Sequence, residues 1–414
     1  MNAPLTFNSD YVETLPNHIP QELVHDFDHF DPVKSSKDPF KPFLDLQATA
    51  PDIFYSRNHG GFWVAQKYDT QKYIMQTPKL FSSWPMNIPY VPAWPRKLLP
   101  VELDPPEHKK YRGLLAPLFT PKAVALMEPM IRQACEELVD GFTDSSEIEF
   151  LKDFARPFPT NAFLSLMGLP LSDAEKLLDI EDRIMHPSYS AEIKIQAGID
   201  IMVYMTEALA KTRKQPQDSN KLLSHISYSK DKEGNALSDE EILDIGFLMF
   251  MAGLDTVTSL FGFSFAHLAN NHQLQQQLIK NLDDPKALDC AVDELLRKFP
   301  SVNTNRTVLE DCEIDGITLK RGDRIMLPIV LANHDPSKFK CPHQVDLARE
   351  DNEQMLFGHG PHKCIGQHLG RLELRIALET ILRRKPYFSI PADKEISTYG
   401  GGVMGTLSLP LCWK

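Results

Sequence analysis

Phe357-Gly-His-Gly-Pro-His-Lys-Cys364-Ile-Gly366 is the stretch that decides the fold of this chain. It places one cysteine in a glycine-rich loop. Apolar residues recur at helical spacing through the next segment, 367–384, so we predict a helix directly after the loop. Backbone N–H groups and the positive end of a helix dipole favour a thiolate at such a junction. Taken alone, the cysteine is a reactive or a buried thiol, or the single thiolate ligand of an iron whose opposite face stays open.

The loop resembles the haem-binding loop of the cytochrome P450 family, whose pattern is Phe-x-x-Gly-x-x-x-Cys-x-Gly. Phe357, Gly360, Cys364 and Gly366 fill every fixed position of that pattern. The resemblance implies haem b as cofactor, with Cys364 as the axial ligand of the iron. It gives Phe357, Gly360 and Gly366 structural roles in shaping the loop.

The composition is that of an ordinary globular protein, with 414 residues, of which 42% are hydrophobic and 24% charged. A formal net charge of −12 gives no electrostatic support to nucleic-acid binding. The six cysteines form no Cys-x-x-Cys pair, which argues against a zinc ribbon or redox dithiol and suits a reducing cytoplasm. The apolar run 242–269 contains Asp244 and Asp255, so we expect a buried helix rather than a membrane span, and no membrane anchor.

Hydrophobic periodicity predicts a mainly α protein with a minor β part. The resemblance implies one triangular, α-rich domain over residues 1–414, with a β-richer part at roughly 1–100. It places the haem between the long central helix and the helix after the cysteine loop. The predicted helices are 121–140, 160–168, 172–185, 191–214, 238–270, 272–281 and 285–299, and the strand-like stretches are 61–65, 313–320, 324–330 and 396–411.

The predicted central helix carries small residues and an acid–alcohol pair. Ala252, Gly253 and Thr256 lie three and four residues apart, so they share a helix face on which a flat ligand could approach the backbone. A threonine in mid-helix most often bonds the carbonyl four residues back, here that of Ala252. The adjacent Asp255 is costly in an apolar helix unless it is paired or functional. The segment resembles the family's oxygen-activation motif, which implies that Thr256 holds dioxygen and a water and that Asp255 relays protons.

Two arginines and a glutamate form a second candidate constellation. Glu294 and Arg297 are three residues apart and therefore on one helix face, an arrangement that alone is usually surface decoration. The family uses such a pair as a structural lock behind the haem, with a basic third partner that Arg349 matches.

Haem carries two propionates, which need cationic or hydrogen-bonding partners. The alternative for each matching residue is a solvated charge. By resemblance, the propionate partners are His108, Arg112, Arg306 and His362. Segments expected near the thiolate also carry a basic patch, either a docking site for an acidic redox partner or scattered surface charge. The patch consists of Lys109, Lys110, Arg112, Lys122, Lys363 and Arg371.

Within the family, the chain is most similar to soluble bacterial members of the camphor-hydroxylating type. The substrate loop departs from them, because Arg96 stands where those enzymes have a tyrosine that binds the substrate ketone. The remaining pocket candidates are apolar, which suits a terpenoid or norisoprenoid, whereas Arg96 would suit an apolar or aromatic acid. The pocket candidates are Trp84, Arg96, Leu98, Val101, Leu248, Met251, Ala252, Val302, Gly402 and Val403.

The resemblance implies a monooxygenase that hydroxylates a small hydrophobic substrate with O2. Its electrons would come from NADH through a flavoprotein reductase and a two-iron ferredoxin, and the family's default state is a monomer. The alternatives are a peroxide-driven peroxygenase, against which the Asp255–Thr256 pair argues, and a haem-based sensor.

Overall fold

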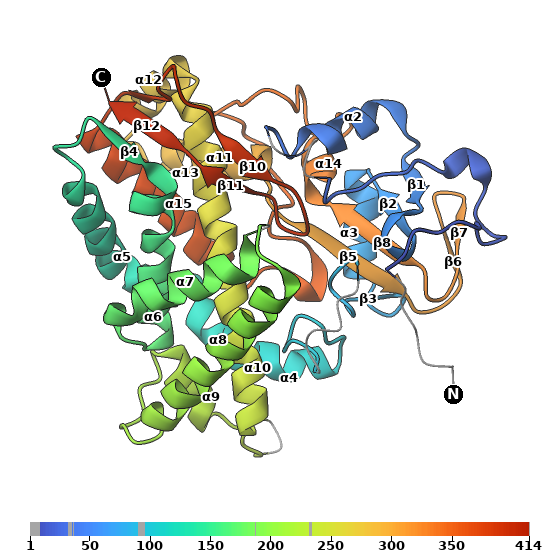
Figure 1. Ribbon diagram of the computed structural model, residues 1–414, viewed down its shortest axis with the longest axis horizontal. Coiled ribbons are helices and arrows are strands. Elements are labelled where there is room, and N and C mark those ends of the chain that lie inside the picture. The colour runs from blue at the N-terminus through green and yellow to red at the C-terminus, as the bar shows by residue number, and fades with distance from the viewer. Residues whose placement is uncertain are drawn as a thin grey trace.

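Helices make up one side of the molecule and a small sheet with its covering helices makes up the other (Figure 1). The computed structural model describes residues 9–413, apart from 32–34, 36, 90–95, 187 and 232–233. The helices are α2 (Lys41–Thr49), α3 (Tyr68–Gln76), α4 (Glu107–Leu115), α5 (Pro121–Gly141), α6 (Pro157–Met167), α7 (Ala174–Met185), α8 (Ala191–Thr212), α9 (Leu222–Tyr228), α10 (Asp239–Gly253), α11 (Asp255–Ala269), α12 (His272–Lys280), α13 (Pro285–Lys298), α14 (Ile329–Asn333) and α15 (Gln367–Arg384).

The largest sheet has the strand order β1-β2-β8-β5-β3. Its β1–β2 hairpin turns at Gly61, where a Cβ would lie only 1.8 Å from the Tyr55 hydroxyl, so glycine is required. Strand β8 pairs parallel with β2 and antiparallel with β5, which sets Arg306 opposite Ile325. The strands are β1 (Ile53–Ser56), β2 (Phe62–Ala65), β3 (Phe81–Ser82), β4 (Glu147–Glu149), β5 (Asn303–Val308), β6 (Cys312–Ile314), β7 (Ile317–Leu319), β8 (Arg324–Pro328), β9 (Phe388–Ser389), β10 (Ser397–Tyr399), β11 (Gly405–Ser408) and β12 (Pro410–Trp413).

The helix that follows the cysteine loop has the bounds predicted for it, residues 367–384. It packs in one apolar core with α5, whose start is fixed by Pro121 in the first turn and by the Thr120 hydroxyl, which accepts from the Ala123 N–H. The predicted helices over 172–185, 191–214, 272–281 and 285–299 are confirmed to within two residues at each end.

The predicted single helix over 238–270 is interrupted. It begins with a capping box between Ser238 and Glu241, but the helical assignment stops at Gly253 and resumes at Asp255. Leu254, at the break, has φ −103° and ψ −65°. The run Asp239–Ala269 is long and apolar enough to cross a membrane, and 72% of its most apolar window is buried inside the protein. Figure 1 shows α10 and α11 running through the helical side of the molecule.

Several shorter elements differ from prediction. The stretch 324–330 leaves the sheet after Pro328, because its chain turns into the short helix α14. The stretch 396–411 is divided among β10, β11 and β12 rather than one strand. Helices α2, α3 and α9 were not predicted; none exceeds nine residues, a length over which periodicity gives a weak signal.

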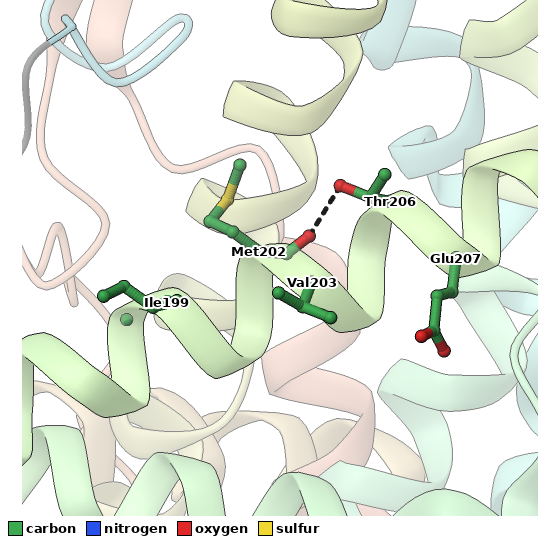
Figure 2. Close-up of a pocket in the computed structure, with 6 residues that line it drawn as sticks. Ile199, Met202, Val203, Thr206 and Glu207 are labelled. Carbon is green, nitrogen blue, oxygen red and sulfur yellow. Dashed lines mark hydrogen bonds between the residues drawn. The ribbon is translucent and has the colours of Figure 1, made fainter.

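A shallow surface pocket of about 340 Å³ lies on α8 (Figure 2). Ile199 and Val203 contribute exposed apolar side chains to it, and the Thr206 hydroxyl donates to the Met202 carbonyl at 2.8 Å. None of its lining residues is a predicted site residue, so the pocket does not mark the expected reaction centre.

Candidate active site

The cysteine loop is a tight turn closed by one hydrogen bond. The Cys364 N–H donates to the Phe357 carbonyl at 2.8 Å. Gly360 has φ 72°, and a Cβ there would lie 2.3 Å from the Met75 carbonyl oxygen of α3, so only glycine fits between loop and helix. Gly366 is the N-cap of α15, which brings the start of that helix next to the cysteine.

Burial raises the pKa of the Cys364 thiol, whereas the Gly366 N–H and the charges of Arg112 and Arg371 lower it. The groups that favour the thiolate are therefore present, but burial raises the pKa of Cys364 by more than they lower it. The Cys364 side chain is nevertheless exposed by its accessible area.

Four basic side chains from three segments converge beside this loop. His108 and Arg112 come from α4, Arg306 from β5 and His362 from the loop itself. The rings of His108 and His362 have centroids 4.3 Å apart. Burial, and after it the charges of Arg306, His108 and Arg112, together lower the pKa of His362 to about 3.

This basic cluster contains polar atoms without a hydrogen-bond partner among the described residues. In the part of the chain that the structure describes, His108 Nδ1 and His362 Nε2 are buried without a hydrogen-bond partner. Arg306 is 6% exposed and donates to Thr304 Oγ1 and the Asn305 carbonyl rather than to a carboxylate. Burial lowers the pKa of Arg306 to about 10, because the opposing effect of the Asp104 charge does not offset the loss of hydration. The cluster therefore suits a bound anion.

An acid lies at the break in the central helix. Asp255 is 5% exposed, and its Oδ1 accepts from the Tyr399 hydroxyl at 2.9 Å. Its Oδ2 is buried and has no partner among the described residues. Burial and the nearby charge of Glu181 raise the pKa of Asp255 to about 7, against the lowering effect of the Tyr399 hydrogen bond and the Arg156 charge. A carboxyl group with such a pKa can both release and accept a proton near neutral pH.

The small residues next to Asp255 differ from one another in their contacts. The Thr256 hydroxyl donates to the Ala252 carbonyl at 2.8 Å, the ordinary bond of a mid-helix threonine. Ala252 is exposed although it lies on a mostly buried helix. A Cβ on Gly253 would lie 3.2 Å from the ring of Phe163 on α6, so we attribute this glycine to helix packing rather than to the approach of a flat ligand.

Glu294 and Arg297 form a fully buried ion pair. Arg297 Nε lies 2.8 Å from Glu294 Oε2, and Arg349 Nε lies 2.9 Å from the same oxygen. Burial alone would raise the pKa of Glu294, but hydrogen bonds from Arg297 and the Asp346 N–H lower it overall. Arg297 also donates to the carbonyls of Asn333, Pro342 and Gln344, so the pair joins α13 to the irregular segment before the cysteine loop.

The family model described as Cytochrome P450 matches residues 171–408. The chain belongs to the cytochrome P450 family. It is 35% identical to the probable cytochrome P450 127A1 of Sinorhizobium fredii, over 96% of this chain and 97% of that protein. It is 27% identical to the vitamin D(3) 25-hydroxylase of Pseudonocardia autotrophica, over 88% of this chain and 90% of that protein. This P450 is therefore a monooxygenase, an oxidoreductase that uses haem, a substrate and redox partners.

Solved P450 structures have the same fold. The crystal structure of CYP101C1 matches with a TM-score of 0.88 and 28% identity, over 97% of this chain and all of that chain. The crystal structure of CYP101J2 matches with a TM-score of 0.86 and 29% identity over the same shares. These likenesses confirm the predicted mainly α fold of the bacterial P450 type.

The residues of this P450 fit a haem. An accessible cysteine at the start of α15 is the ligand type that the family's iron takes, and Arg112 of the basic cluster interacts electrostatically with it. The unpartnered ring nitrogens of His108 and His362 and the positive charges of Arg306 and Arg112 suit the two carboxylates of a haem. When bound there, haem would supply the iron at which dioxygen is activated.

Arg96 already has a carboxylate partner in the protein. Its Nε and Nη2 donate to Asp244 of α10 at 2.8–3.1 Å, and Glu240 lies 3.9 Å from its Nη1. Asp244 is 3% exposed, so the pair ties the loop before α4 to the central helix. This contact removes the electrostatic reason for expecting a carboxylate on the substrate.

The other pocket candidates are distributed over three regions. Trp84 lies under the Lys97 ammonium, 5.2 Å from its ring centroid, whereas Trp94 of the same loop lies outside the described residues. Val302 and Val403 form an isolated β-bridge, which brings the C-terminal region to the start of β5. Leu248 is buried, and the half-buried candidates are Leu98, Val101, Met251, Val302, Gly402 and Val403.

The predicted basic patch is partly neutralised. Lys110 lies 2.9 Å from Glu241, and Arg371 lies 2.8 Å from Asp293. Arg112 donates to the Lys363 carbonyl. Within this patch, the exposed lysines for which the described part of the chain shows no ion pair are Lys109, Lys122 and Lys363.

Sequence reasoning missed the partners of the two acids on the central helix. Tyr399 lies 144 residues from Asp255, and Arg96 lies 148 residues from Asp244. Charges inside an apolar helix signal that partners exist, but nothing in the spacing identifies them. Arg156, which is paired with Glu181 at 2.6 Å, was missed for the same reason.

Substitution of Glu294 by alanine is expected to destabilise this P450 by about 3–5 kcal/mol, because it leaves the buried charge of Arg297 uncompensated. Urea unfolding followed by circular dichroism measures the change. The matched control is Glu128→Ala, which breaks a more exposed pair with Arg132 and should cost less than about 1 kcal/mol. Equal losses in the two variants would contradict the buried lock.

Proposed function

We propose that this P450 hydroxylates an unactivated C–H bond of a small, neutral, hydrophobic substrate such as a terpenoid or norisoprenoid. The observation that carries the proposal is the buried acid at the break in the central helix, which has one oxygen free next to Thr256. A peroxygenase that takes its oxygen from peroxide has no need of such a proton source. A hydroxylase among the curated relatives, the vitamin D(3) 25-hydroxylase, agrees with this type of reaction.

The proposed roles follow from position and charge. Cys364 is the ligand of the haem iron, and the four members of the basic cluster hold the propionates. Asp255 accepts and releases protons at Oδ2, and Thr256 orients a water at its hydroxyl. Glu294, with its two arginines, fixes the segment that leads into the cysteine loop.

The substrate side is apolar. Leu248 and Met251 lie on α10 before the helix break, and Val302 and Val403 lie on the strand side. Because Arg96 is paired with Asp244, a neutral substrate agrees better with this lining than an apolar or aromatic acid does.

Electrons are proposed to come from NADH through a flavoprotein reductase and a two-iron ferredoxin. Exposed Lys109, Lys122 and Lys363 stand against a net charge of −12, which favours docking of an acidic partner near the cysteine loop. We further propose that residues 1–414 act as one domain, as a monomer, in the cytoplasm.

Two measurements test the proposal. The reduced, carbonyl-bound protein should absorb in a band strongly red-shifted from that of a histidine-ligated haem, because a thiolate donates electron density to the iron. Spectral titration with neutral terpenoids and with their carboxylic acids should then show low-spin to high-spin conversion for the neutral compounds only. Conversion by the acids alone would overturn the substrate class, whereas turnover with hydrogen peroxide but not with NADH and redox proteins would overturn the monooxygenase cycle.

A further inference from the structure

Two histidines and an aspartate meet on the β-rich side of the molecule. Asp28, His29 and His59 each offer one ligand atom, and these atoms all lie within 4.8 Å of one another. His59 Nε2 lies 2.8 Å from Asp28 Oδ1. Two imidazoles and a carboxylate are a common ligand set for first-row divalent metals.

The hydrogen bond of His29 leaves the correct nitrogen free for a metal. Its Nε2 lies 3.0 Å from the Ile88 carbonyl oxygen, which can only accept, so Nε2 carries the hydrogen. Nδ1 therefore holds the lone pair, and it is buried without a partner among the residues described. Histidines that bind metals usually donate their other N–H to a carbonyl or carboxylate in this way. The His29 side chain is 3% exposed, so its lone pair has no ready access to bulk water.

The backbone at His59 is held in an unfavourable conformation. Its φ of 54° and ψ of 41° lie in the left-handed region, which a residue with a Cβ adopts at a cost. That conformation places the ring 5.3 Å from the His29 ring, measured between centroids. Phe30 and Phe62 contact both histidine rings and shield the cluster on its apolar side.

We propose that Asp28, His29 and His59 form a second metal site, separate from the haem, for a divalent transition metal such as Zn²⁺. The set provides three protein ligands and leaves one position for water. The cluster differs from an ordinary His–Asp pair by its third ligand. His18 and Asp323 form such an ordinary pair, and no third ligand joins them among the described residues.

Metal binding at this site would brace the loop that precedes the substrate region. Through its bond to Ile88, His29 ties residues 28 and 29 to the segment that begins at Trp84. A metal on Nδ1 fixes the His29 ring from the opposite side, so the Ile88 carbonyl is held more firmly. The metal therefore acts on the same loop as the Arg96–Asp244 pair, from its other end.

Isothermal titration of the haem-loaded, chelator-treated protein with ZnCl2 tests the site. We expect one Zn²⁺ per chain and a rise in the thermal unfolding midpoint. Asp28→Asn and His59→Ala should each weaken binding more than about 10-fold, since even partners outside the ligand shell contribute about 10–100-fold. His18→Ala is the matched control. It should bind Zn²⁺ as tightly as the wild type does, because the His18–Asp323 pair is not part of the proposed metal site.

Three outcomes would overturn the proposal: no binding, unchanged binding in both ligand variants, or an equal loss in His18→Ala. Asp28 is 39% exposed, so Asp28→Asn tests the site without disturbing a core side chain. An unchanged carbonyl-bound spectrum of each variant shows that its fold and haem site are intact. These measurements do not depend on the substrate or on the redox partners.

Discussion

Replacement of Cys364 by serine is expected to abolish coupled hydroxylation. Changes to groups around metal ligands already cost about 10–100-fold, and this change removes the proposed ligand itself. Serine has a far weaker tendency to ionise than cysteine, and the Gly366 N–H and the charges of Arg112 and Arg371 do not compensate for that difference. Product formation per NADH, with saturating redox proteins and substrate, measures the loss.

The spectrum provides a second readout for this variant. The strongly red-shifted carbonyl-bound band should disappear in Cys364→Ser and persist in Cys341→Ser, a control at another exposed cysteine. A Cys364→Ser protein that keeps both the band and coupled turnover would show that the iron takes a different ligand.

Replacement of Asp255 by asparagine is expected to slow turnover by about 10²–10⁴-fold, the range associated with loss of a positioned proton donor. Asparagine keeps the size of the side chain and an acceptor for the Tyr399 hydroxyl, but it cannot exchange a proton at neutral pH. Substrate binding, measured by spectral titration, should change little.

Thr256→Ala should also bind substrate normally but convert more of the NADH-derived electrons to peroxide.

The pH dependence of turnover distinguishes a proton role from a structural one. The Tyr399 hydroxyl lowers the pKa of Asp255, so Tyr399→Phe should raise that pKa above about 7 and move the corresponding limb of the kcat profile to higher pH. The groups that face Asp255 are Tyr399 from β10, Glu181 from α7 and Arg156 at the start of α6. Tyr387→Phe, at an exposed tyrosine, is the control and should leave the profile in place. A profile unmoved by Tyr399→Phe, or a turnover rate unaffected by Asp255→Asn, would contradict the role of this acid.

The Asp255 carboxyl group also makes the stability of the folded protein depend on pH. Its pKa in the folded protein, about 7, lies above its ordinary value of 3.8. The stability that it contributes is therefore complete below pH 3.8 and is lost as the pH rises through about 7. In Asp255→Asn this part of the pH dependence of unfolding should be absent.

Local sequence signals predicted the elements that frame the site. Helix α15 has its predicted bounds, Gln367–Arg384, because its apolar repeat and the glycine loop before it are signals that extend over only a few residues of sequence. The family's motifs predict Cys364, Asp255 and Thr256 as site residues, and the fold confirms the family. The break at Leu254 could not be predicted, because apolar periodicity continues through it on both sides.

Contacts between distant segments could not be predicted from spacing. Arg96 was expected either to face a substrate acid or to be exposed. It is exposed, with 37% of its side chain accessible, but its pairing with Asp244 could be seen only in the packed structure. Asp28, His29 and His59 carry no ligand spacing in sequence, because a β-hairpin and a left-handed residue bring them together. Such sites depend on tertiary geometry rather than on a pattern of residues.

The interruption at Leu254 divides the central helix into two parts with different proposed tasks. Leu248 and Met251, which we propose to face the substrate, lie on α10 together with Asp244, the partner of Arg96. The acid Asp255 begins α11 and is held by Tyr399 of β10. Substitutions that reshape α10 for a new substrate therefore leave the anchoring of the acid in place. Within the central helix, directed evolution of selectivity should concentrate its successful changes in Asp239–Gly253 and leave Asp255–Ala269 nearly unaltered.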